Sequence, residues 1–104
     1  MKLPPGQRPD ASELYTLEEA DREVREEVPP SGKLVYYTLK QEGEMSQPAL
    51  RDETLLDERT VRKGLEDLDE VDVVYDRPNL MDARSDIYGL KIDEFLEGDG
   101  HGTD

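Results

Sequence analysis

Two helical segments separated by only a few residues lie in the middle of this chain, and this spacing limits how the region can fold. Ser46 precedes the stretch QPALRDE, and Asp57 precedes ERTVRKGLEDLDE. Serine and aspartate are both preferred at helix N-caps. A brief turn, residues 54–56, joins the two helices. In the second helix the apolar residues that repeat at i, i+4 and i+7 are Val61, Leu65 and Leu68. The sequence therefore predicts two helices packed closely across a tight turn.

Two further helices are predicted before this pair. Thr16 and Glu19 match the T-x-x-E pattern of a capping box, which starts a helix that the prolines at 29–30 end. Ser31 is expected to cap the next helix, GKLVYYTLKQE, and Gly43 to end it. The predicted apolar faces are Leu17, Ala20, Val24 and Val28 in the first helix, and Leu34, Val35, Tyr37 and Leu39 in the second. We expect the tyrosines Tyr36, Tyr37 and Tyr88 to lie in the core or at its edge.

The periodicity changes after Glu70. The stretch VDVVYD is β-branched and aromatic, which favours a strand, and DIYGLKI alternates like a second strand. The loop RPNLMDARS joins them. A tight helix pair followed by a hairpin is the arrangement of a helix-turn-helix with a wing. We therefore predict an α+β, mainly α fold, a winged helix-turn-helix. It has three core helices, a two-stranded β wing and an extra N-terminal helix.

The length of 104 residues allows one small domain. We place the winged helix-turn-helix at residues 31–96. Before it we predict a flexible lead at 1–15, then an amphipathic helix and Pro-Pro linker at 16–30. A disordered acidic tail is predicted at 97–104.

Three stretches of the chain carry a resemblance to a known family: PPSGKLVYYTL, SQPALRDETLLDERTVRKGLEDL and MDARSDIYGL. From residue 31 to residue 92, the sequence resembles the small winged helix-turn-helix regulators of haloarchaea, which are related to the MarR group. In that family the RTVR segment opens the DNA-reading helix and the DAR segment lies in the wing. The resemblance implies groove contacts from Arg59, Thr60, Arg62 and Lys63, and backbone contacts from Arg84 and the nearby Arg77. The chain departs from the family at Asp72, where a glycine is usual, and at Arg51, where a small residue is usual.

Helical geometry alone also separates the basic residues of the fourth helix from its buried face. Arg59, Arg62 and Lys63 lie largely opposite the apolar residues, with Thr60 beside them. Arginine can bind guanine through two hydrogen bonds, and lysine or threonine can hold phosphates or bases. The alternative is a solvated face stabilised by pairs such as Glu58–Arg62.

Other polar residues are candidates for contacts with the DNA backbone. Gln47 and Arg51 lie on the short helix, and Arg77 and Arg84 flank the wing loop. The alternative for the wing arginines is local pairing with Asp76, Asp82 or Asp86.

The charge balance of the chain is strongly acidic, with 27 Asp and Glu against 13 Lys and Arg and a net charge of -14. We interpret this mainly as halophilic adaptation, since molar salt screens the repulsion between carboxylates. An ordinary acidic protein or a nucleic-acid mimic is the alternative. The chain has no cysteine, which excludes disulfides and thiolate metal sites. It has no apolar run long enough to span a membrane, and a cytoplasmic location is expected.

Catalysis is not expected. The only histidine, His101, lies in the glycine-rich tail, and no cofactor or metal site is predicted. The sequence instead favours a sequence-specific, double-stranded DNA-binding transcription regulator of a halophile. A homodimer would place helix 57–70 in the major groove and the wing, 76–86, on the backbone. The alternative is a winged-helix protein-interaction module that does not bind DNA. The sequence specifies no effector ligand.

Overall fold

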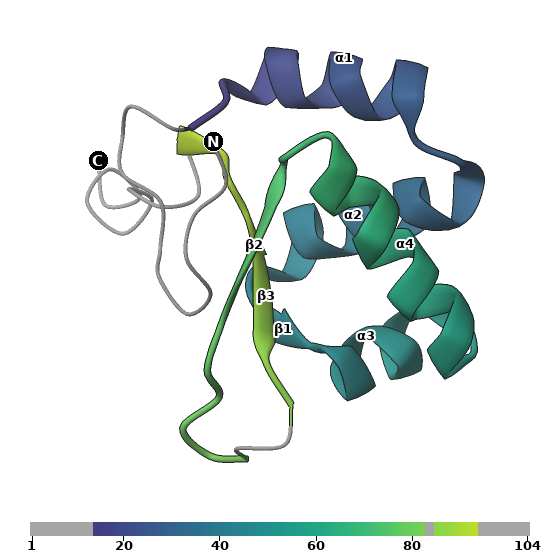
Figure 1. Ribbon diagram of the computed structural model, residues 1–104, viewed down its shortest axis with the longest axis vertical. Coiled ribbons are helices and arrows are strands. Elements are labelled where there is room, and N and C mark those ends of the chain that lie inside the picture. Colours follow the sequence, from purple (N-terminus) through teal and green to yellow (C-terminus); the bar gives the residue numbers. More distant parts are fainter. Residues whose placement is uncertain (1–13, 83–84, 94–104) are drawn as a thin grey trace.

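The computed structural model describes residues 14–82 and 85–93 of the chain. Its elements are α1 (Leu17–Glu27), α2 (Pro30–Glu42), β1 (Met45–Ser46), α3 (Gln47–Thr54), α4 (Glu58–Glu70), β2 (Val74–Arg77) and β3 (Ile87–Leu90). Helices α2, α3 and α4 lie together on one side of the strands (Figure 1). Helix α1 lies at one end of the molecule, and α3 lies at the other end with the turn of the β2–β3 hairpin (Figure 1). The predicted mainly helical α+β winged helix is confirmed.

Three of the four helices begin where side chains predict that they should. The hydroxyl of Thr16 accepts a hydrogen bond from the backbone N–H of Glu19, and the Glu19 carboxylate accepts one from Thr16 in return. Ser46 caps α3, and Asp57 caps α4 through a 2.7 Å bond from the N–H of Thr60. The predicted cap at Ser31 is wrong. Helix α2 begins at Pro30, because a proline at the first helical position has a suitable φ and needs no N–H partner.

The core forms where α2 packs across α4. The predicted face of α4, Val61, Leu65 and Leu68, is buried. Close approach of the two helices requires Gly64, where a Cβ atom would lie 3.2 Å from the Cα of Gly32. The stripe of α1 is buried in the same core through Ala20, Val24 and Val28. This stripe therefore packs on the protein's own domain.

The apolar face predicted for α2 is partly wrong. Val35 and Leu39 are buried as expected, but Leu34 is 38% exposed and Tyr37 is 56% exposed. Tyr36 is buried in place of Tyr37. Residues that face α4 must follow helical spacing from the close approach at Gly32, and positions 35, 36 and 39 do so. Tyr88, by contrast, packs against the core as predicted.

The sheet has three strands, whereas two were predicted. Its order is β1-β3-β2, and both pairings are antiparallel. Met45 pairs with Tyr88, so the two-residue β1 ties the α2–α3 connection to the hairpin. Strand β2 begins later than predicted, because Val71 and Asp72 form a turn with Asp72 in the left-handed region at φ 63°. Asp72 thus adopts the left-handed conformation at the position where the family that the sequence resembles usually has glycine.

The chain before α1 also joins the sheet. Tyr15 forms an isolated parallel bridge with Ile92, and its N–H donates a 2.8 Å hydrogen bond to the carbonyl of Lys91. Tyr15 was assigned to the flexible lead on sequence grounds. Of that lead, the structure describes only residues 14 and 15. Among the described helices, none has both the length and the apolar character that crossing a membrane requires.

Candidate nucleic-acid interface

The solvent-facing side of α4 carries the basic residues identified from the sequence. Arg59, Arg62 and Lys63 are exposed, and Thr60 is half-buried beside them. All four lie in the first half of the helix, where the Asp57 cap fixes its start. Hydrogen bonds from Thr60 lower the pKa of the Asp57 carboxyl, and the positive charge of Arg59 adds to this effect. The structure therefore displays these side chains together on one accessible face.

The three cations of this face differ in how firmly they are held. Arg62 lies 3.8 Å from the Glu58 carboxylate, and both side chains are more than half exposed. Such an exposed pair contributes only a few tenths of a kcal/mol, so Arg62 can exchange partners readily. Within the described residues, Arg59 has no ion pair at all.

Lys63 is held more firmly. Its ammonium donates a 2.5 Å hydrogen bond to the buried Asp67 carboxylate, and this bond raises the pKa of Lys63. The second oxygen of Asp67 is buried without a partner. Losing the lysine would leave that carboxylate less well compensated, so Lys63 is tied to the fold. The arrangement leaves Arg59 and Arg62 as the more available cations.

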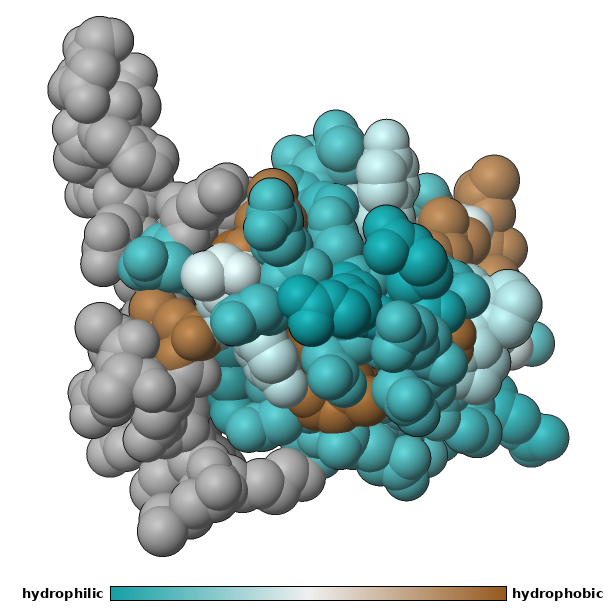
Figure 2. All heavy atoms as spheres, turned by 90° about the horizontal axis from the view of Figure 1, so that it is seen from above, coloured by the Kyte–Doolittle hydropathy of each residue, from teal (hydrophilic) through white to brown (hydrophobic). Residues whose placement is uncertain are grey.

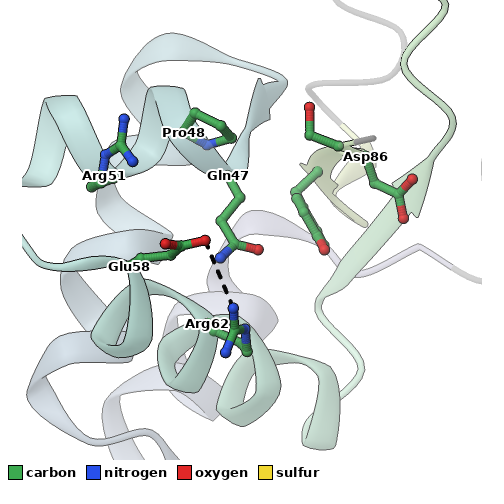
Figure 3. Close-up of a pocket in the computed structure, with 8 residues that line it drawn as sticks. Gln47, Pro48, Arg51, Glu58, Arg62 and Asp86 are labelled. Carbon is green, nitrogen blue, oxygen red and sulfur yellow. Dashed lines mark ion pairs between the residues drawn. The ribbon is translucent and has the colours of Figure 1, made fainter. Parts of the chain in front are cut away.

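A polar groove of about 330 Å³ separates α3 and α4 from the hairpin. Its lining residues are Gln47, Pro48 and Arg51 of α3, Glu58 and Arg62 of α4, and Ser85, Asp86 and Tyr88 of the hairpin. Figure 3 shows the Gln47 side chain extending between Glu58 and Arg62, with the Glu58–Arg62 ion pair drawn as a dashed line. The groove thus brings together guanidinium, amide and hydroxyl donors with two carboxylates. This donor set can bind phosphate oxygens, provided that Glu58 releases Arg62.

The predicted site residues on α3 both line this groove. Gln47 is half-buried, whereas Arg51 is exposed and lies 3.4 Å from the Asp52 carboxylate. This exposed contact is weak. The sequence identified Gln47, Arg51 and Arg62 separately, and the structure brings them to one groove. The sequence analysis did not assign Ser85 or Tyr88 to a binding site, because they reach the groove only through the pairing of β3 with β1.

Arg77 does not line the groove, and its guanidinium pairs with Glu44 instead. Its Nε and Nη2 donate hydrogen bonds of 3.1 and 2.7 Å to one oxygen of Glu44, and these bonds raise the pKa of Arg77. The Tyr75 hydroxyl donates to the other oxygen of Glu44. The sequence analysis considered only Asp76, Asp82 and Asp86 as local partners. Contact between Arg77 and phosphate stays a prediction, and Arg84 lies outside the described residues.

The bridge to Glu44 depends on a glycine in the neighbouring strand. A Cβ atom at Gly89 would lie 2.5 Å from the Tyr75 hydroxyl oxygen, so Tyr75 crosses β3 only because residue 89 has no side chain. A glycine inside a strand often marks such a close approach. This was the one sequence signal that could have revealed the network.

The fold and the displayed α4 face together define a winged helix-turn-helix. No protein-family model and no curated protein sequence matches the chain. Several solved structures, by contrast, match the fold of this chain. The reduced form of AbfR bound to DNA matches with a TM-score of 0.60 and 18% identity over 80% of this chain. A probable transcriptional regulator from Pseudomonas aeruginosa matches with a TM-score of 0.61 and 19% identity, over 83% of this chain and 71% of that one. A mutant of MepR from a multidrug-resistant S. aureus clinical isolate matches with a TM-score of 0.53 and 18% identity, over 79% of this chain and 62% of that one.

At these identities the comparisons establish the fold. The chain spans 62% of the length of the AbfR chain. One of the proteins that share this fold is described as a probable transcriptional regulator. In the part of the chain that the structure describes, no three His, Asp or Glu side chains are placed to hold a metal ion.

Proposed function

We propose that the protein is a sequence-specific, double-stranded DNA-binding transcription regulator. The observation that carries the proposal is the exposed face of α4, which presents Arg59 and Arg62 from the first half of the second helix of a helix-turn-helix. Residues at that position contact base edges when such a helix enters the major groove. One structural neighbour, AbfR, was solved bound to DNA. The resemblance of the sequence to MarR-related haloarchaeal regulators points in the same direction.

In this proposal the groove beside α4 receives the sugar-phosphate backbone. Gln47 and Arg51 hold phosphate oxygens, and Arg62 exchanges Glu58 for DNA. The exchange is inexpensive because the Glu58–Arg62 contact is long and exposed. Arg59 reads a base edge, Thr60 and Lys63 support it, and Arg77 and Arg84 contact the flanking backbone. Glu58 and Asp86 also line the groove, which disfavours binding by charge attraction alone.

The quaternary structure and cellular setting belong to the same proposal. We infer a homodimer that binds two half-sites about one helical turn apart, in the cytoplasm of a halophile. The apolar stripe of α1 does not supply the dimer contact, because it is buried in the protein's own core. A protein-interaction module without DNA contact is not favoured, since it leaves the basic face of α4 without a role.

Selection of bound fragments from random duplex DNA, in molar KCl, tests the proposal. Wild type should enrich a palindromic motif. Arg59→Ala should relax one position of that motif and weaken binding by about 1–3 kcal/mol, and Arg62→Glu should abolish enrichment. Arg22→Glu is the matched control, because Arg22 is an exposed arginine on α1. Absence of enrichment by folded wild type, or an unchanged motif with Arg62→Glu, would refute sequence reading by α4.

A further inference from the structure

The turn of the hairpin presents two apolar side chains to solvent. Leu80 and Met81 are each 93% exposed. They occupy the centre of a turn in which the N–H of Asp82 donates a 3.2 Å hydrogen bond to the carbonyl of Asn79. The Asn79 side chain also accepts a 3.0 Å bond from the N–H of Met81. Turn centres usually hold Gly, Pro, Asn, Asp or Ser, so leucine followed by methionine is unusual there. The turn therefore presents an apolar pair that no other described residue covers.

The charged side chains of the described residues around this pair are mostly negative. Arg77, the cation among the described residues of the hairpin, is paired with Glu44 at the loop end of β2. Asp82 adjoins the pair, and Asp76 and Asp86 lie in or beside the strands. An apolar tip with few free cations favours contact with an apolar surface, such as the faces of stacked bases, over contact with phosphate oxygens.

The position of the hairpin relative to α4 identifies such a surface on DNA. Ser85, Asp86 and Tyr88 form the hairpin side of the groove, and Arg62 lies on the opposite side. If α4 occupies the major groove, one backbone strand lies in this groove. The hairpin turn then reaches past that strand, and the next feature of the duplex is the minor groove. The turn and α3 project at the same end of the molecule (Figure 1).

We propose that Leu80 and Met81 enter the minor groove and wedge between two base pairs, which unstacks that step and bends the duplex. Leucine and methionine are among the side chains that architectural DNA-binding proteins insert in this way. Pyrimidine–purine steps such as TA are the easiest to unstack, so the wedge favours sites with TA beside the bases that α4 reads. The inference rests on the proposed DNA binding, and it assigns the hairpin an apolar contact in addition to any contact with the backbone.

The test uses the full chain and a duplex about two helical turns long that carries the palindromic motif selected from random DNA, with a TA step beside each half-site. The adenine of one TA step is replaced by 2-aminopurine, whose fluorescence rises on unstacking, and the ends carry a donor–acceptor pair that reports bending. Wild type should raise both signals. The double variant Leu80→Ser/Met81→Ser should show neither unstacking nor bending. It should bind at least about tenfold more weakly, because it no longer buries two apolar side chains on binding.

Leu55→Asn is the matched control, because Leu55 is 90% exposed but lies in the α3–α4 turn. This variant should keep wild-type affinity and both signals. Thermal unfolding should show that both variants fold, as expected for exposed positions. Binding of wild type without unstacking, or equal signals from the double variant, would overturn the wedge alone. A loss of self-association in sedimentation, in place of a loss of unstacking, would also overturn it and assign the pair to a second copy. Absence of any DNA binding by wild type would overturn the proposed function as well.

Discussion

At the scale of single residues, Leu55 is the least expected feature of the structure. It ends α3 in the left-handed region at φ 63°, where glycine is usual, and its side chain is 90% exposed. At the corresponding end of α2 the chain uses Gly43. Asp72 shares the left-handed conformation, but its carboxylate accepts a hydrogen bond from the buried Lys91 ammonium. The Leu55 N–H donates a 3.0 Å hydrogen bond to the Arg51 carbonyl, but its exposed side chain adds little packing to offset the strain.

We therefore expect Leu55→Gly to stabilise the protein. Relief of the left-handed strain contributes about 1–2 kcal/mol, and the greater freedom of glycine in the unfolded chain removes roughly 0.5–1 kcal/mol. The net gain in the free energy of unfolding should be about 0.5–1 kcal/mol, measured by urea titration.

The control for this change is Leu80→Gly. Leu80 is as exposed as Leu55 but is not among the residues with a positive φ. Glycine at position 80 should give no gain. If both glycine variants lost stability to the same extent, the strain argument would be incorrect.

At the scale of elements, the β2–β3 hairpin contains a pair of close carboxyl groups. Partial burial raises the pKa of Asp76 above its ordinary value of 3.8, and a hydrogen bond and charge from Asp86 add to the shift. The folded state therefore disfavours ionised Asp76. This group's stabilisation is complete below pH 3.8 and is lost as the pH rises through the folded pKa. At neutral pH the hairpin is held together despite this repulsion.

Asp76→Asn should consequently stabilise the protein at neutral pH. We expect roughly 0.5–1 kcal/mol, a figure reduced because solvent reaches this half-buried position. The advantage of the variant should shrink as the pH falls through the raised pKa of Asp76, where the wild-type carboxyl becomes protonated. Urea unfolding at a series of pH values measures this difference.

Glu66→Gln provides the comparison, because Glu66 is an exposed carboxylate on α4 with a similar change in charge. Its effect should be smaller at neutral pH than that of Asp76→Asn. A constant difference between Asp76→Asn and wild type at all pH values would contradict the pKa argument.

The elements that the sequence predicted well are those with local signals. Thr16, Ser46 and Asp57 start helices because each bonds to an N–H three residues away, and such contacts are written in the order of residues. Strand β1 has only two residues, too few for an alternating pattern, and it exists because Met45 meets Tyr88 across the sheet. The partner of Arg77 was missed for the same reason. Glu44 is distant in sequence and becomes its neighbour only through the strand order.

At the scale of the whole molecule, negative charge dominates the surface. The net charge is -14, and the face that carries α1 is largely hydrophilic, with hydrophobic residues in small separate patches (Figure 2). The sequence could predict this balance and the exposed basic face of α4, because both follow from residue type and helical period. It could not predict the groove between α4 and the hairpin, whose walls come from three separate segments of the chain.

This charge leads us to expect that KCl stabilises the fold. The distance over which charges interact falls from about 30 Å at 0.01 M salt to about 3 Å at 1 M, which removes most of the repulsion between carboxylates. The melting temperature should rise steadily across this range. A scan of thermal unfolding against KCl concentration measures it.

The double variant Glu26→Lys/Glu27→Lys tests the cause. Both glutamates are exposed at the end of α1, and each change makes the net charge less negative by two units. The melting temperature of the variant should rise less steeply with KCl concentration than that of wild type. An equal slope for both proteins would show that salt acts other than through the net charge.

Under the proposed function, the Glu44 bridge to Tyr75 and Arg77 has a consequence for how tightly a duplex can be held. It fastens the hairpin to the chain that leads into α3, so the spacing between hairpin and α4 is set before any ligand arrives. A pre-organised pair of contacts spares the entropy of ordering a loop on association. The duplex must then adjust to the protein. Sequences whose grooves already match that spacing, or deform to it easily, are held for longer than those that resist.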